Sequence, residues 1–117
     1  MKYISVSNRA HGANDIYVGR SKPRPSVLGN PFIMYDESMR DDVCVRFAEW
    51  FADVLQVEDS PQSIEMIRLV DMAIKGPVAL ICHCAPKACH GNVIARTLHY
   101  MVLERGYVWK SGAYKRV

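Results

Sequence analysis

The sequence contains no long hydrophobic run. Its longest continuous apolar stretches, such as Val78 to Cys82, are far shorter than the roughly 20 residues that a membrane-spanning helix requires. The first residues, MKYISVSNRAHG, include one lysine and no extended apolar core, so we do not expect a secretory signal. These absences favour a cytoplasmic protein that does not enter a membrane.

Cysteine and net charge are also modest. The chain has four cysteines, and without a secretion signal we expect them to be reduced thiols rather than a disulfide framework. Fifteen basic and 12 acidic residues give a formal net charge of +3, which is too small to indicate a nucleic-acid-binding protein by itself. Nucleic acid remains an alternative partner because basic residues and stackable aromatic rings occur near both ends, but scattered charges more often form a solvated surface.

The length and apolar content indicate one folded domain. With 117 residues, half of them hydrophobic, the chain can bury a single core, and we expect residues 1–117 to form one α/β domain. Neither a P-loop nor a G-x-G-x-x-G fingerprint is present, so the two best-defined nucleotide-binding motifs are missing.

Strand-like and helix-like segments alternate along the chain. The expected elements are a strand over Lys2 to Ser7, a strand over Asp15 to Arg20, a proline-rich loop over Ser21 to Phe32, helices over Ser38 to Val57, Pro61 to Lys75 and His90 to Glu104, a strand over Val78 to Cys84, and a hairpin or edge strand in the tail. This order predicts a small three-layer domain with a mainly parallel sheet.

Capping residues and apolar spacing define the helices further. Ser38 with Asp41, and Ser60 with Pro61, are typical of helix starts. The residues expected to face the core are Val43, Phe47, Trp50, Phe51 and Val54 in the first helix, Ile64, Ile67, Val70 and Ile74 in the second, and Val93, Ile94, Leu98 and Met101 or Val102 in the third.

The segment VALICHCAPKACHGNVIARTL, residues 78–98, holds the main candidates for chemistry. A metal site is one interpretation, because Cys82, Cys84, Cys89 and His90 are soft ligands. Their spacing departs from the usual paired knuckles, and adjacent Cys89 and His90 would have to bind one ion. Cys82 has a simpler interpretation as a small buried apolar residue.

A cysteine nucleophile is a second interpretation. Cys89 lies at a predicted helix N-terminus, where the helix dipole is expected to lower the pKa of a thiol. His90 is the candidate catalytic base beside it, with His83 at the strand end as another. A Cys/His enzyme that cleaves or transfers a nucleotide glycosidic or phosphoester bond therefore stays open.

The third interpretation is a cradle for phosphate, and the sequence favours it. The helix that starts near Cys89 offers unpaired amides, and Gly91 allows a ligand to approach the backbone. In a parallel sheet the strand ends at Gly19 and Cys82 would meet at one edge. The expected ligand-binding residues are Gly19, Arg20, Asn30, Cys84, Lys87, Gly91 and Asn92. No cofactor is expected beyond such a ligand.

Three motifs together resemble the domain-of-unknown-function 4326 family of small bacterial and phage proteins. They are IYVGR, PSVLGNPF and CHCAPKACHGNVIA, in that order. The family pattern falls on Gly19 and Arg20, on residues 29–32, and on Cys82, Cys84, Pro86, Cys89, His90 and Gly91. The chain departs from the pattern at His83, where an aromatic residue is common, and at Asn92, where an acidic residue is common.

The resemblance implies a small Rossmann-like fold and supplies no reaction. It would suit a phage accessory protein that acts on nucleotide signals or host defence. Binding of a nucleotide-derived ligand is the first hypothesis; a Cys/His enzyme, a small zinc module and a host-factor inhibitor are the alternatives. A homodimer that completes the pocket is also expected for so small a chain.

Overall fold

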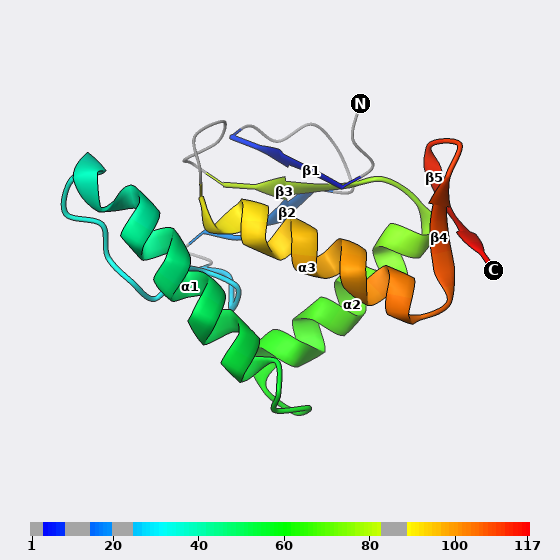
Figure 1. Cartoon of the computed structure of the whole chain (residues 1–117), viewed down its shortest axis with the longest axis horizontal. Coiled ribbons are helices and arrows are strands. Elements are labelled where there is room, and N and C mark those ends of the chain that lie inside the picture. Colours follow the sequence, from blue (N-terminus) through cyan, green and yellow to red (C-terminus); the bar gives the residue numbers. More distant parts are fainter. Residues whose placement is uncertain (1–3, 9–14, 20–24, 83–88) are drawn as a thin grey trace.

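The computed structural model describes residues 4–8, 15–19, 25–82 and 89–117. Its elements are β1 (Ile4–Ser7), β2 (Asp15–Tyr17), the 3-10 turn η1 (Glu37–Met39), α1 (Arg40–Val54), α2 (Pro61–Lys75), β3 (Val78–Ile81), α3 (His90–Glu104), β4 (Tyr107–Lys110) and β5 (Ala113–Arg116). The chain is thus an α/β protein, as its alternating sequence pattern predicts (Figure 1).

Three strands form a parallel sheet in the order β1-β3-β2. Ile4 pairs with Val78, and Ile16 pairs with Leu80, so the apolar residues of all three strands share one face. Central β3 is the most buried strand: Val78 and Leu80 are fully buried, while Ala79 and Ile81 on the opposite face are only half-buried. We expected β3 to be buried on both faces, but it is fully buried on one face only.

The helices pack on the apolar face of the sheet and on one another. Helix α3 runs alongside the strands and contacts β1 and β3, α2 contacts β3, and α1 packs against the other two helices (Figure 1). The core is formed by Leu80 of the sheet, Phe47 and Phe51 of α1, and apolar residues of α2 and α3. The described elements give two layers, a sheet and a helical layer; the expected third layer is not among them.

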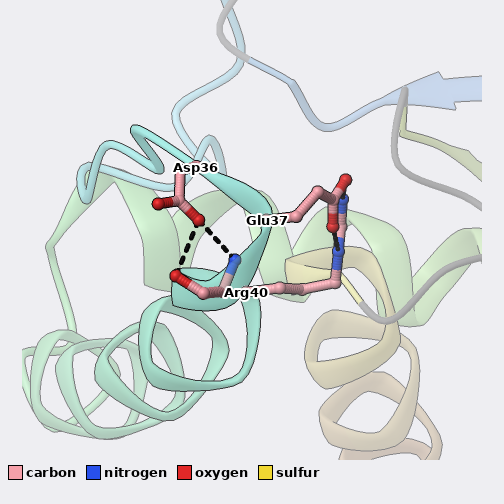
Figure 2. A network of polar contacts seen from close by, with 4 residues as sticks. Asp36, Glu37 and Arg40 are labelled. Atoms are coloured by element: carbon pink, nitrogen blue, oxygen red, sulfur yellow. Dashed lines mark hydrogen bonds and ion pairs between the residues drawn. The ribbon is translucent and has the colours of Figure 1, made fainter.

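The start of α1 differs from the sequence prediction. Asp36, rather than Ser38, caps this region: its carboxylate accepts hydrogen bonds from the amide and the hydroxyl of Ser38, each at 2.6 Å (Figure 2). These two hydrogen bonds lower the pKa of Asp36, and the bond from the Ser38 hydroxyl has the larger effect. Ser38 lies within η1, and α1 begins at Arg40 with no side-chain cap. The predicted capping box with Asp41 is therefore wrong.

Helices α2 and α3 begin and end where the sequence indicates. Ser60 caps α2 by accepting a hydrogen bond from the amide of Ser63 at 3.1 Å, with Pro61 in the first turn. The buried face of α2 differs in part from the expected one. Val70 is buried and Ile74 packs against the core as expected, but Ile64 and Ile67 are 59% and 45% exposed. The buried positions are Ser63, Met66, Leu69, Val70 and Ala73.

The tail folds as the antiparallel hairpin β4–β5. Ser111 and Gly112 both have positive φ, 54° and 78°, which is the geometry of a two-residue hairpin turn. The hairpin packs against the C-terminal half of α3 through the buried Tyr114 (Figure 1). Within the described part of the chain, no helix is long and apolar enough to cross a membrane.

Candidate functional site

The carboxyl ends of the three parallel strands lie at one edge of the sheet. The pairing continues one residue past each strand: the amide of Val18 donates to the carbonyl of Ile81 at 3.0 Å, and the amide of Cys82 donates to the carbonyl of Ser7 at 2.8 Å. Val18 and Cys82 are both buried there. The two strand ends that the sequence singled out are therefore neighbours, as predicted from a parallel sheet.

Helix α3 starts at the same edge. Cys89 is its N-cap residue, and the side-chain oxygen of Asn92 accepts a hydrogen bond from the amide of Cys89 at 3.1 Å. The sulfur of Cys89 lies 3.3 Å from this oxygen. Asn92, a predicted ligand-binding residue, thus caps the helix.

His90 joins α3 to both strand ends. Its Nε2 lies 2.6 Å from the carbonyl oxygen of Val18, and its Nδ1 lies 3.7 Å from the sulfur of Cys82. Because a carbonyl can only accept, Nε2 carries the proton, and Nδ1 is left as the acceptor for the Cys82 thiol. The ring edge also meets Phe47 at 5.2 Å between centroids, and the residue is 8% exposed.

The thiol of Cys89 differs from the reactive thiol that the sequence suggested. Cys89 is 4% exposed. A hydrogen bond with Cys82 and burial raise the pKa of Cys89, and hydrogen bonds from the amides of Gly91 and Asn92 offset this only in part. The predicted lowering of the pKa by the helix N-terminus is therefore wrong. The first-turn amides that could have met a phosphate are directed at the Cys89 sulfur instead.

Gly91 allows α3 to lie close against the sheet. A Cβ at this position would meet Cγ1 of Val6 at 3.0 Å, and Cβ of Cys82 and the sulfur of Cys89 at 3.4 Å each. Gly91 is itself buried. Its lack of a side chain serves helix–sheet packing in the described part of the site.

Gly19 and Asn30 lie in the loop region after β2. The carbonyl of Gly19 accepts a hydrogen bond from the amide of Ser26 at 2.9 Å. Asn30 is 7% exposed, and its side-chain oxygen accepts from the amide of Phe32 at 2.9 Å, which fixes a local turn. Asn30 therefore has a structural role in this turn.

Three predicted ligand-binding residues, Arg20, Cys84 and Lys87, lie outside the described residues, as does the alternative base His83. Within the ranges that the structure describes, no three His, Cys, Asp or Glu side chains are grouped so as to hold a metal. Cys44, Cys82 and Cys89 are not joined in disulfide bonds. The catalytic roles of Cys89 and His90 stay predictions.

The chain segments that continue from the three strand ends have a marked charge bias. Residues 9–14, 20–24 and 83–88 follow β1, β2 and β3 in the sequence and contain no aspartate or glutamate. Their basic residues are Arg9, Arg20, Lys22, Arg24 and Lys87. The segments that follow the three strands in the sequence therefore contain basic residues and no acidic ones.

Sequence reasoning missed two partners of the site. The carbonyl of Val18 and the ring of Phe47 both contact His90, and neither carries a recognisable motif. Cys82 was considered as a metal ligand or a buried apolar residue, but its thiol faces the imidazole of His90. The parallel pairing of β2 with β3 is the signal that could have placed Val18 next to this histidine.

Comparison with known proteins gives one match. No curated protein and no solved structure matches the chain. A family model described as "Domain of unknown function (DUF4326)" matches residues 5–100, which include most of β1 and most of α3. The three motifs of the sequence and the edge that they build all fall within this match, and the chain belongs to the DUF4326 family.

Proposed function

We propose that the protein binds a nucleotide or a nucleotide-derived phosphate ligand at the carboxyl edge of its parallel sheet. The observation that carries this proposal is the meeting of three strand ends with the start of α3, where each strand continues into a segment with basic and no acidic residues. Ligands of open parallel sheets bind at this edge, and phosphate is attracted by basic side chains.

Binding fits the described residues better than catalysis does. A binding site needs a rigid base, and Cys82, Cys89 and His90 supply one through buried mutual contacts. A nucleophile needs an accessible thiolate, whereas Cys89 is buried with a raised pKa. Arg20, Lys87 and the amide of Asn30 are the proposed ligand contacts.

A Cys/His enzyme is the second candidate, and the pairing of Cys82 with His90 is the observation in its favour. Its reaction would cleave or transfer a glycosidic or phosphoester bond of a nucleotide. Incubation with nucleotides followed by product analysis tests it. Turnover by the wild type that is lost in both Cys82→Ser and His90→Ala, while the ligand still binds, would show that the site is catalytic. The enzyme would then replace the proposal of binding alone.

Thermal denaturation in the presence of AMP, ATP, ADP-ribose, NAD and inorganic phosphate tests the binding proposal. At about ten times Kd a ligand adds about 1.4 kcal/mol of stability, which raises Tm by roughly 5 °C for a domain of this size. Arg20→Ala should remove the shift, and Arg46→Ala, on the exposed part of α1, should keep it. Absence of a shift with every ligand would overturn the proposal.

Finer assignments belong to the same proposal. A Rossmann-like arrangement is supported by parallel strands joined through helices, as in β2–α1–α2–β3. A cytoplasmic setting is supported by Cys44, Cys82 and Cys89, which are reduced rather than joined in disulfide bonds. A phage accessory role, a homodimer and inhibition of a host factor are the further proposals to test once a ligand is known.

A further inference from the structure

A pocket lies away from the carboxyl edge of the sheet. It has a volume of about 370 Å³ and lies between β1, the middle of α3 and the C-terminal hairpin. Its lining includes Ile4, Arg96, His99, Tyr100, Trp109 and Tyr114. Nine residues of α3 separate His99 from His90, which is about 13 Å along the helix axis. The pocket is therefore distinct from the site at the start of α3.

Aromatic rings form the wall of this pocket and are held in place. Trp109 meets Tyr114 edge to face, with 5.0 Å between ring centroids and 71° between planes. His99 lies 5.6 Å from the Tyr114 ring, and its Nδ1 lies 2.7 Å from the Tyr114 hydroxyl. Tyr114 is only 7% exposed, while Trp109 is 42% exposed. A buried tyrosine thus positions an indole ring that a ligand can reach.

The charge of the lining is positive. Arg96 lies three residues before His99 and four before Tyr100 on α3, so the three side chains share one face of the helix. Among the described residues, no acidic side chain lines the pocket. A guanidinium next to an aromatic wall favours a ligand that has both a flat ring and a negative charge.

We propose that this pocket binds a small aromatic anion, a molecule that joins one or two flat rings to a carboxylate or phosphate. The ring would stack on Trp109, and the anionic group would pair with Arg96. The volume is at the small end of the range of ligand pockets, which excludes large ligands. This proposal does not depend on the proposed function, because it uses different residues.

Titration with 1-naphthoate, followed by the indole N–H signals in a proton–nitrogen NMR spectrum, tests the proposal. The chain has two tryptophans, so Trp109→Phe assigns the two signals. The Trp109 signal should move and saturate at millimolar ligand, while the Trp50 signal stays in place. Parallel titrations with 1-naphthyl phosphate and AMP distinguish a carboxylate, a phosphate and a nucleotide as the source of the anion.

Variants separate specific binding from general hydrophobic attraction. Arg96→Gln should raise the Kd for 1-naphthoate by up to about fivefold, because a surface charge pair contributes at most about 1 kcal/mol. It should leave the binding of neutral 1-naphthylmethanol unchanged. Arg46→Gln is the matched control and should bind as the wild type does. A Trp109 signal that does not move, or equal Kd values for Arg96→Gln and the wild type, would overturn the proposal.

Discussion

At the scale of single residues, His90 is the centre of the described site. One imidazole connects the first turn of α3 to the carbonyl of Val18, which is 72 residues away in the sequence, and to the thiol of Cys82. Both ring nitrogens are used in these contacts. A histidine that is engaged in this way positions three chain segments relative to one another, and its first measurable effect should be on stability.

We predict that His90→Phe lowers the free energy of unfolding by about 1–3 kcal/mol, because the buried carbonyl of Val18 loses its donor. The phenyl ring keeps the volume and the contact with Phe47. His90→Gln retains a side-chain N–H and should lose less. Urea denaturation measures both, and equal losses in the two variants would show that the hydrogen bond to Val18 is not what stabilises the site.

The raised pKa of Cys89 predicts how stability depends on pH. The folded state keeps the Cys89 proton to a higher pH than the unfolded chain, so this contribution is complete at neutral pH. This stabilising contribution is lost as the pH rises above about 8.5, the pKa of a cysteine thiol in the unfolded chain. The loss is at most about 1.4 kcal/mol per pH unit.

Denaturation of the wild type and Cys89→Ser between neutral and alkaline pH measures this effect. Serine keeps an N-cap acceptor and does not titrate in this range. The difference in stability between the two should narrow as pH rises, whereas Cys44→Ser should follow the wild type in parallel. A constant difference for Cys89→Ser would contradict the raised pKa.

At the scale of elements, the sequence predicted the ends of α2, although the local prediction for the start of α1 was wrong. Ser60, Pro61 and Gly76 bound α2 correctly because capping is a local interaction. The buried face of α2 was predicted only in part. Val70 is buried as expected. Ile64 and Ile67 are exposed, and Met66 and Leu69 are buried in their place. Apolar residues occupy most of the circumference of this helix, and the choice between faces is made by α3 and β3, which the local pattern does not contain.

The same division applies to the candidate site. That the ends of β2 and β3 are neighbours followed from the rule for parallel sheets, and β2–β3 pairing confirms it. The roles of Asn92 and Asn30 did not follow, because each is set by one hydrogen bond to a particular amide. Such bonds depend on backbone geometry that residue types alone do not fix.

Close approach of α3 to the sheet gives a prediction for Gly91→Ala. Alanine would normally favour a helix by up to about 1 kcal/mol over glycine, but here its Cβ meets Val6, Cys82 and Cys89 together. Overpacking of this kind costs about 1–3 kcal/mol, so we expect a net loss of roughly 1 kcal/mol.

Gly76→Ala is the control for this substitution. Its Cβ would have nothing within 4 Å, and its φ of 179° is open to any residue. We expect its stability to stay within about 0.5 kcal/mol of the wild type. Chemical denaturation of both variants decides between them, and a stabilised Gly91→Ala would show that the sheet yields to the added methyl group.

At the scale of the whole molecule, α3 links the two proposed sites, for which we expect different chemistry. Its first turn lies at the carboxyl edge of the sheet, and its middle lines the aromatic pocket with the hairpin. Among the described residues, no side chain belongs to both proposed sites. Sites this far apart without common partners usually behave additively.

A crossed set of variants tests this independence. Arg20→Ala should abolish the Tm shift with the nucleotide that binds the sheet edge and leave the Kd for 1-naphthoate within about twofold of the wild type. Arg96→Gln should do the reverse, and the double variant should show both losses without further change. Because each variant is the control for the other, a fault in folding would affect both ligands at once. If Arg96→Gln also removed the nucleotide shift while the protein stayed folded, the nucleotide would have to reach the pocket beside Trp109, and the two proposed sites would be one.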